Sequence, residues 1–293
     1  MKRIFSKDIL KSYAFLLPFA FFIIAFILIP VIGAIINSFY QDVTFKAREF
    51  IQFENYTSLF QDSGFWQSLR FSLWFVLVSV PFELLLGMIF ALLLNQIRKF
   101  RGLIWAAVLI PWAIPSAISA RTWELIYNYN YGLANYALSA IGITQEPVNW
   151  LGTSIGAFIS VVIADAWKTA PFITIILLAG LQGIPDDLYR QSRIDGANFV
   201  QGFRKITLPL LKPVIVVALL FRTIDALRVF DVIYVLTGGG PGGATTSLSI
   251  FGYNYYINGD FGYGSAVSVV LFAIAFGLSV LYVKMSRFKT GIR

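Results

Sequence analysis

The residues that could do chemistry in this chain are ionisable side chains set inside long apolar segments. Asp165 and Lys168 are three residues apart, a spacing that places both on one face of a helix. A second set recurs every three residues with alternating sign: Arg222, Asp225, Arg228 and Asp231. An ionisable group inside a membrane costs about 2.5–3.5 kcal/mol and usually faces a bundle interior or a watery cavity. Two interpretations stay open, namely ion pairs that join helices or subunits, and part of a pathway for a polar solute.

Aromatic residues beside these charges suit a solute that carries many hydroxyl groups. Sugar rings stack on aromatic rings and form hydrogen bonds with charged and amide groups. The candidates for stacking are Trp167, Phe230 and Tyr234. We expect Arg228 and Asp231 to lie nearest the middle of their helix, and we rank them first for contact with the solute.

Several kinds of chemistry lack their usual residues here. The chain has no Cys and no His, so disulfides and thiolate metal sites are excluded and the commonest general base is missing. No GxxxxGK[ST] motif occurs, so the chain does not bind ATP through a P-loop. Gly238, Gly240 and Gly243 fit GxGxxG, but they follow an apolar segment rather than a strand, so we predict a tight turn. We expect no catalytic residue, no bound cofactor and no metal site.

The segments that hold these residues have the composition of a membrane protein. Hydrophobic residues make up 58% of the chain and charged residues 13%, whereas soluble domains average about 45–50% and about 25%. Six mostly apolar windows are long enough to span a bilayer, and they cover residues 13–36, 69–95, 103–127, 155–179, 208–236 and 265–283. We therefore predict an all-α integral membrane protein with six transmembrane helices, forming one transmembrane permease domain over residues 1–293.

Two of these spans carry residues that are unusual inside a membrane. Pro111 and Pro115 fall within the third span, where each removes a backbone donor and bends the helix. Such a bend could line a cavity, act as a gate, or simply serve packing. Glu83 lies in the second span, and a proton-coupled carrier would use such a carboxylate. A single Glu in a helical bundle is more often hydrogen-bonded to a neighbouring helix.

The distribution of basic residues predicts the orientation in the membrane. Sixteen of the 23 Lys and Arg lie in the two ends and in the second and fourth connections, if Lys212 at the start of the fifth span is counted with the fourth connection, whereas the third and fifth connections have none. This asymmetry predicts that both termini are cytoplasmic and that the connections 37–68, 128–154 and 237–264 are external. The formal charge of +8 is explained in this way, so we expect membrane lipid and not nucleic acid as its counterpart.

The fourth connection, residues 183–207, is polar and basic, and we call it the polar hairpin. Pro185 followed by two Asp residues predicts the start of a helix. Gly196 predicts a bend before a second helix. Apolar side chains recur along the segment, at Tyr189, Ile194, Ala197 and Phe203. An ordinary helix lying on the lipid headgroups is the alternative interpretation.

The polar hairpin resembles the EAA loop of ABC importer permeases. Gly196, Ile206, Leu208 and Pro209 have the spacing of that motif, and IDGA and ITLP match its carbohydrate-importer form. Similar segments occur upstream as AGLQ followed by Ile184-Pro185, downstream as FDVIYVLTGGGP, and in the first external connection as Asn55-Tyr56 with Phe65-Trp66. The similarity covers nearly the whole chain and is specific to the binding-protein-dependent, maltose-type permeases.

The resemblance implies partners and a division of roles. It implies one of two different permease subunits in a bacterial or archaeal cell membrane, driven by a cytoplasmic ATPase dimer that binds ATP and Mg, with an extracytoplasmic solute-binding protein. Contact with the ATPase would involve Tyr189, Arg190, Ile194, Asp195, Gly196, Ala197 and Phe203. One departure is that Arg190-Gln191-Ser192 stands where the family has Glu-Ala-Ala. Arg190 reverses the charge of the acidic contact, so either the ATPase carries a compensating acid or docking depends on residues 195–203.

A second function fits the same composition. An ion-coupled secondary transporter would move a polar solute without an ATPase, using Glu83, Asp165 or Asp225 to carry protons or sodium. Uptake by this chain alone in ATP-free vesicles distinguishes the two functions.

Overall fold

The computed structural model describes residues 7–97 and 99–286, with side chains over 15–97 and 99–284. The chain forms two compact units, and each is described by itself. The first consists of Met1–Asp62 with Phe251–Phe272, and the second of Ser63–Ile250 with Ala273–Arg293. Both termini fall outside the described residues, so their predicted cytoplasmic location stays a prediction.

The first unit begins with a long apolar helix. α1 (Lys7–Ile23), the π-helical turn η1 (Ile24–Leu28) and α2 (Ile29–Asn37) follow one another without a break. None of the apolar window within Phe15–Asn37 is buried. A helix that is apolar on all sides needs lipid or another protein around it.

A short connection in the first unit is fixed by side-chain hydrogen bonds. It holds two antiparallel strands and one helix, β1 (Tyr40–Gln41), β2 (Glu49–Phe50) and α3 (Glu54–Gln61). Asn55 Nδ2 donates to the carbonyl oxygens of Ser38 and Tyr40, each at 2.9 Å. Asp62 Oδ2 accepts from the phenols of Tyr255 at 3.2 Å and Tyr263 at 3.0 Å. Burial, and then the charge of Asp62, raise the pKa of Tyr255, which keeps that phenol a donor.

The core of the second unit is formed by three packed helices, α4 (Ser63–Gln96), α8 (Ser154–Gln182) and α11 (Leu208–Leu227). Small residues permit close approach, as is common between helices in membranes. A Cβ on Gly87 of α4 would lie 2.6 Å from Ile173 Cγ2 of α8. A Cβ on Gly180 of α8 would lie 2.6 Å from Leu211 Cδ1 of α11. Larger residues at these two glycines would push the three helices apart.

The third predicted span is broken rather than merely bent. α5 (Arg101–Ala113) packs against α8. The next helix, α6 (Ser116–Ile126), is bent from the direction of α5 by 89°. Pro115 precedes α6, and Pro111 lies within the last turn of α5. The prolines thus produce the expected bend, and the backbone between the two helices is extended at Ile114.

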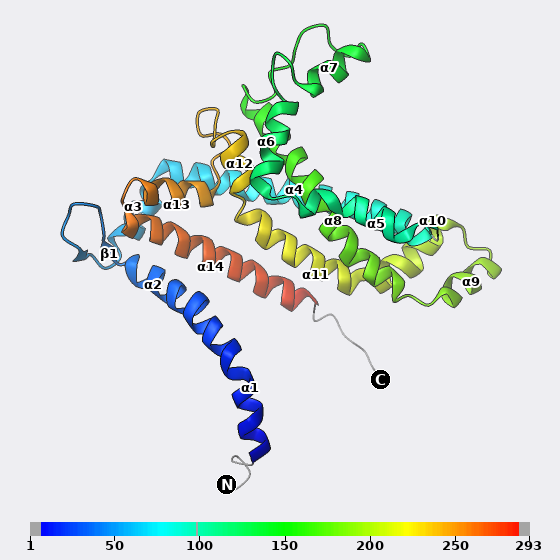
Figure 1. The fold of residues 1–293 in the computed structure, drawn as a ribbon, viewed down its shortest axis with the longest axis horizontal. Helices are drawn as coiled ribbons and strands as arrows, with labels where there is room; N and C mark the ends of the chain where they lie inside the picture. Colours follow the sequence, from blue (N-terminus) through cyan, green and yellow to red (C-terminus); the bar gives the residue numbers. More distant parts are fainter. Residues whose placement is uncertain (1–6, 98, 287–293) are drawn as a thin grey trace. The chain divides into compact units, whose positions relative to one another are not determined.

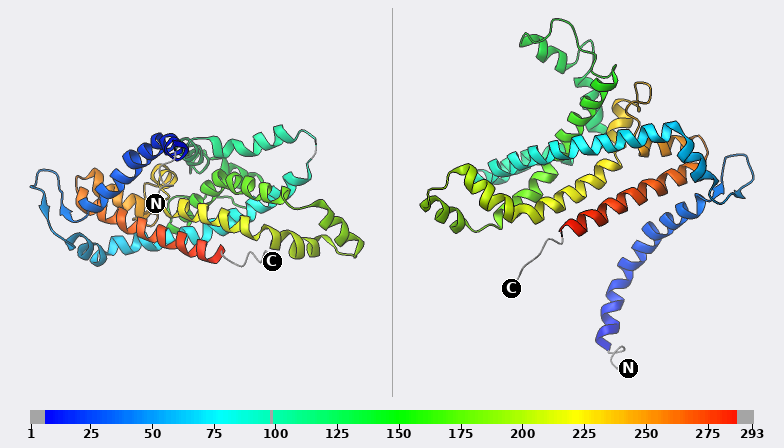
Figure 2. Two further views of the ribbon diagram at one scale, coloured as in Figure 1. Left: turned by 90° about the horizontal axis from the view of Figure 1, so that it is seen from below. Right: turned by 180° about the vertical axis from the view of Figure 1, so that it is seen from behind.

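The polar hairpin joins α8 to α11 and contains two short helices. α9 (Asp186–Ile194) follows Pro185 as expected, and α10 (Phe199–Gly202) begins with a capping box between Asn198 and Gln201. The π-helical turn η2 (Phe203–Thr207) then continues directly into α11. Figures 1 and 2 show α9 and α10 at one end of α8 and α11, and α6, α7 (Leu133–Ala140) and α12 (Asp231–Leu236) at the other.

Four helices among the described residues are long and apolar enough to cross a membrane, or five if α5 and α6 form one span. The four are Phe15–Asn37, Ser63–Gln96, Ser154–Gln182 and Phe261–Lys284, the last within α14 (Phe261–Ser286). Each of them covers its predicted apolar window to within a few residues. The fifth predicted span falls on α11, which has 20 residues and carries three charged ones. The structure therefore supports a mostly helical multi-pass protein, and the count of six belongs to the proposal below.

The glycine-rich segment after α12 forms a turn, as predicted, and not a nucleotide-binding loop. It follows a helix rather than a strand, and α13 (Leu248–Ile257) comes after it. Gly239 has φ +88° and a Cβ there would lie 2.7 Å from Thr246 Oγ1, so glycine is required.

Candidate functional site

A single guanidinium group joins the three core helices of the second unit. Arg222 of α11 donates from Nε and Nη2 to both carboxylate oxygens of Glu83 on α4. Nη2 also donates to Asp165 on α8, and Nη1 donates to Asp225 at 3.1 Å. The planar fork of arginine suits such bidentate contacts. Each of the three helices therefore supplies a charge to the same cluster.

The cluster is almost completely removed from solvent. The side chain of Glu83 is 0% exposed, that of Arg222 2% and that of Asp165 9%. Charges buried this deeply are tolerated because they are paired and hydrogen-bonded, and loss of one partner leaves another charge unpaired. The expectation for Glu83 is met, since it is bonded to a neighbouring helix. Asp165 lies three residues before Lys168 on α8, as predicted, and its hydrogen-bonded partner is Arg222.

The predicted continuous stripe along the fifth span is wrong in its second half. α11 ends at Leu227, and Arg228 and Phe230 have non-helical backbone angles. Asp231 begins the separate helix α12. At the break, Ser247 Oγ donates to the Val229 carbonyl at 2.7 Å, so a side chain from outside both helices satisfies this carbonyl. Arg228 and Asp231 therefore lie at a helix junction and not at mid-helix.

The first half of that stripe does form ion pairs. Asp225 accepts from Arg222 and, at 3.4 Å, from Nη2 of Arg228. The Arg228 side chain is 69% exposed and that of Asp225 is 54% exposed, so this outer pair contributes little to stability. The buried end of the row is structural, and the exposed end faces space that a solute could occupy.

Lys168 closes the break between α5 and α6. Its Nζ donates to the carbonyl of Ile114 at 2.8 Å and to that of Trp112 at 3.3 Å. These carbonyls lie at the carboxyl end of α5, where the helix dipole favours a cation. Prolines in membrane helices are tolerated when neighbouring groups satisfy the freed backbone. Lys168 thus acts on the backbone of the bend rather than as the ion-pair partner of Asp165.

A polar cavity of about 430 Å³ opens between these elements. Seven predicted pathway residues line this charged cavity: Asp165, Lys168, Arg222, Asp225, Arg228, Phe230 and Asp231. The acidic and basic side chains among them number three each, so the lining is formally neutral. The remaining lining residues are Trp112, Ser116, Thr169, Val229 and Val232. A balanced set of donors and acceptors suits an uncharged polar solute better than an ion, and the volume lies in the usual range of ligand sites.

The three aromatic candidates are placed differently. Phe230 lines the charged cavity, and its ring stacks on that of Tyr234 at 5.2 Å between centroids. Tyr234 is not part of the lining. Trp167 lies edge-to-face with Trp123 of α6 at 5.9 Å and is also outside the lining. Of the three, only Phe230 is brought to the cavity in this conformation.

Of the residues predicted to contact an ATPase, the polar hairpin exposes four to solvent and partly buries three. Ile194 is 85% exposed, and Arg190, Asp195 and Gly196 are also exposed. Tyr189 is partly buried and bonds Thr207 Oγ1 at 2.9 Å, which ties α9 to the start of α11. Ala197 and Phe203 are partly buried.

Gly196 ends α9 with φ +79°, and a Cβ there would meet nothing within 4 Å, so only the backbone conformation requires glycine. Arg190 lies 3.7 Å from Asp187, an exposed pair that leaves the positive end of Arg190 accessible. The charge reversal at the EAA position is therefore present at the surface.

Some lining residues were missed by the sequence interpretation. Trp112 and Ser116 each directly follow one of the two prolines, Pro111 and Pro115, which were considered as a possible cavity wall, so these prolines were the available signal. Val229 and Val232 had none, because no proline or glycine marks the break between α11 and α12. Among the described residues, no set of three His, Cys, Asp or Glu side chains is arranged as a metal site.

Comparison with known families gives one match that covers most of the chain. Residues 83–287 match the family described as "Binding-protein-dependent transport system inner membrane component". The chain is 54% identical over 279 residues to the trehalose/maltose transport system permease protein MalF of Thermococcus litoralis, covering 95% of this chain and 94% of that protein. It is 38% identical over 285 residues to the sulfoquinovosyl glycerol transport system permease protein SmoG of Agrobacterium fabrum, covering 96% and 92%.

Solved structures have the same architecture. A chain of a bacterial ABC transporter that imports the acidic polysaccharide alginate matches with a TM-score of 0.83 at 26% identity, covering 97% of both chains. The same transporter in complex with an alginate pentasaccharide-bound periplasmic protein matches with a TM-score of 0.84, also at 26% identity, covering 97% and 98%.

Proposed function

We propose that this chain, which belongs to the family of binding-protein-dependent transport system inner membrane components, is one permease subunit of an ATP-driven importer for a sugar or a glycosylated polyol. The observation that carries the proposal is 54% identity to a trehalose/maltose permease over 95% of the chain. The second relative and the alginate transporter also have glycosides or carbohydrates in their names. The family membership places the chain in the cell membrane as a multi-pass component.

The charged cavity is the proposed route for the solute. Its lining has both acidic and basic groups with no formal excess of either, so it offers donors and acceptors to hydroxyl groups. Phe230 supplies an aromatic face at its edge. Arg228 and Asp225 are exposed and free to exchange their mutual ion pair for bonds to a solute. Glu83 and Arg222, by contrast, hold the helices in register behind the route.

The energy comes from partner subunits in this proposal. The chain has no P-loop, and a cytoplasmic ATPase dimer supplies ATP and Mg. The polar hairpin, exposed and continuous through η2 with α11, transmits movement of the ATPase to the helix that carries Arg222 and Asp225. A second, different permease completes the pathway, and a binding protein delivers the solute outside. Six spans with both termini in the cytoplasm, as one domain over residues 1–293, place the hairpin on the ATPase side.

Uptake by reconstituted vesicles tests the proposal. The chain is co-purified with its partner subunits and binding protein, inserted in vesicles that contain MgATP, and supplied with radiolabelled trehalose or maltose. We expect uptake that needs hydrolysable ATP and the binding protein, and no uptake by the chain alone. Uptake by the chain alone, driven by a proton or sodium gradient without ATP, would instead establish the secondary transporter.

Glycine substitutions in the polar hairpin test the coupling step in the same vesicles. Gly196→Ala forces an L-residue into φ +79°, at a cost of about 1–2 kcal/mol, and Gly196→Asp adds a charge there. Both variants are expected to lower solute-stimulated ATP hydrolysis and transport together, with normal membrane insertion. Gly202→Ala is the matched control, because a Cβ there meets nothing within 4 Å and its φ is −60°. Equal coupling in Gly196→Asp and the control would contradict the role of the hairpin.

A further inference from the structure

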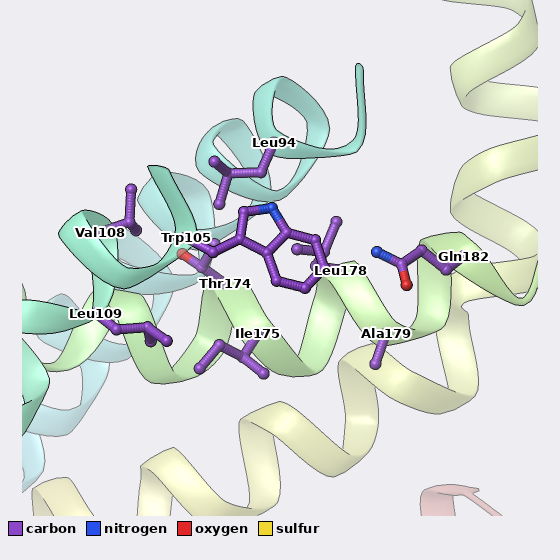
Figure 3. Close-up of a pocket in the computed structure, with 9 residues that line it drawn as sticks. All are labelled: Leu94, Trp105, Val108, Leu109, Thr174, Ile175, Leu178, Ala179 and Gln182. Carbon is purple, nitrogen blue, oxygen red and sulfur yellow. The ribbon is translucent and has the colours of Figure 1, made fainter. Parts of the chain in front are cut away.

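An apolar pocket lies where α5 packs against the ends of α4 and α8 (Figure 3). It encloses about 90 Å³ and is lined by Leu94 of α4, by Trp105, Val108 and Leu109 of α5, and by Thr174, Ile175, Leu178, Ala179 and Gln182 of α8. The Thr174 hydroxyl is already bonded to the Ala170 carbonyl at 2.8 Å. Apart from the Gln182 amide and the indole N–H of Trp105, which is buried without a hydrogen-bond acceptor among the described residues, the wall therefore offers hydrocarbon and the indole ring. Ile175 is 40% exposed, so the pocket is open on one side.

The position of the pocket along the helices places it at a membrane boundary. Leu94 lies two residues before the end of α4, and Gln182 is the last residue of α8. Trp105 belongs to the second turn of α5. Tryptophan is enriched at this depth because its ring is apolar and its N–H is polar. The polar hairpin begins immediately after Gln182, so the pocket lies at the hairpin end of the bundle.

Two cations precede Trp105 at the start of α5, and one of them contacts its ring. The Arg101 guanidinium stacks on the Trp105 ring, 4.2 Å from its centroid. Stacking occupies the flat face of the guanidinium and leaves its N–H edges free to bind oxygen atoms. Lys99, two residues earlier, is exposed. The sequence has no Asp or Glu between Glu83 and Glu124, and in the part of the chain that the structure describes neither cation forms an ion pair.

We propose that this pocket binds one anionic phospholipid. The phosphate is held by Arg101 and Lys99, and one hydrocarbon chain lies along Trp105 in the pocket between α5 and α8. A pocket of this volume that is open on one side admits a short segment of a flexible hydrocarbon chain, whereas a helix of about 10 Å diameter does not fit. Basic groups at helix ends on the cytoplasmic side are typical sites for anionic lipid headgroups. The bound lipid would fix the α4–α5 turn against α8, next to the base of the polar hairpin.

Lipid binding to the importer complex tests this site directly. The chain with its co-purified partner subunits is stripped of lipid in detergent and titrated with phosphatidylglycerol or phosphatidylcholine, and retained lipid is counted by native mass spectrometry. We expect one saturable, phosphatidylglycerol-selective site. Lys99→Gln with Arg101→Gln should weaken it about thirtyfold, because each charge contributes about 1 kcal/mol near an anionic surface. Lys205→Gln, an exposed cation of the polar hairpin, is the matched control for general charge.

A second variant tests the hydrocarbon part of the site. Ala179→Phe fills the pocket and leaves both cations in place, so it should also remove the phosphatidylglycerol site. Inorganic phosphate and glycerol 1-phosphate at millimolar concentration should not compete, because they have no chain. Competition by these ions, equal binding of phosphatidylcholine, or wild-type affinity in Ala179→Phe would each overturn the proposal. The assay measures binding alone, so its outcome does not depend on the transport function.

Discussion

At the scale of single residues, Arg222 has the largest structural role. Its side chain is 2% exposed and contacts carboxylates on three helices. Two of these carboxylates are distant in the sequence, Glu83 by 139 residues and Asp165 by 57. The same residue type at position 228, which is 69% exposed, has one outer contact with Asp225. Two arginines that the sequence presents as equivalent members of one row therefore have different roles, because burial differs.

Replacement of the two arginines should reveal this difference. Arg222→Leu leaves Glu83 and Asp165 buried without a cation, so we expect a loss of about 3–5 kcal/mol in the free energy of unfolding. Arg228→Leu should cost less than about 1 kcal/mol. Reversible unfolding of the chain in mixed micelles measures both.

A combined variant separates unpaired charge from simple loss of packing. Arg222→Leu together with Glu83→Leu and Asp165→Leu removes all three charges, and it should recover much of the stability that Arg222→Leu loses. If the triple variant is less stable than Arg222→Leu, the buried charges are not the cause of the loss.

At the scale of elements, the break between α5 and α6 depends on a side chain from a third helix. The two helices meet at 89°, and Lys168 of α8 donates to the carbonyls of Trp112 and Ile114 at the junction. Pro111 and Pro115 favour a bend, and we expect Lys168 to help set its angle. Lys168 also lines the charged cavity, so the bend and the proposed solute route share one residue.

Removal of this ammonium group should change the bend. Lys168→Met leaves two carbonyls without their donor, and we expect α5 and α6 to adopt wider and more variable angles. Spin labels at Leu103 and Leu125, which are 72% and 60% exposed, can be attached through introduced cysteines because the chain has none. Pulsed electron resonance should then give longer and broader distances in Lys168→Met.

The matched control keeps the donor at the same place. Lys168→Arg retains a cation that can bond both carbonyls, so its distance distribution should stay close to that of the unsubstituted chain. An unchanged distribution in Lys168→Met would show that the prolines and helix packing alone set the angle.

At the scale of the whole molecule, α8 separates two very different surfaces. It has 29 residues, about 43 Å at 1.5 Å per residue, which exceeds the hydrocarbon thickness of about 30 Å. The loop with α7 precedes it, and the polar hairpin follows it (Figure 1). A helix that crosses the membrane once must place these two surfaces on opposite sides.

Labelling of intact cells tests this arrangement and its direction. Tyr136→Cys introduces a single cysteine at an exposed position before the membrane crossing of α8, and Arg190→Cys introduces one after it, in a chain that has no other. A membrane-impermeant maleimide should label Tyr136→Cys in intact cells and Arg190→Cys only after the membrane is opened. The reverse result would place the polar hairpin outside and exclude its contact with a cytoplasmic ATPase.

The sequence by itself determined the class of the protein and the places of its long helices. Apolar length against bilayer thickness is a local property, so windows such as 155–179 agree with Ser154–Gln182. The polar hairpin was predictable for the same reason, since Pro185 and Gly196 act on their own backbone. The spacing of charges also predicted half of the residues that line the cavity.

Only the tertiary structure decided which of these charges meet. Periodicity placed Asp165 and Lys168 on one helix face, but helix packing brings Asp165 to Arg222 and Lys168 to the backbone of α5. α11 likewise ends at Leu227, and Ser247, 18 residues beyond Val229, bonds the Val229 carbonyl just after that end. A charge buried between helices takes the partner that packing brings within reach, and packing joins residues that no local pattern relates.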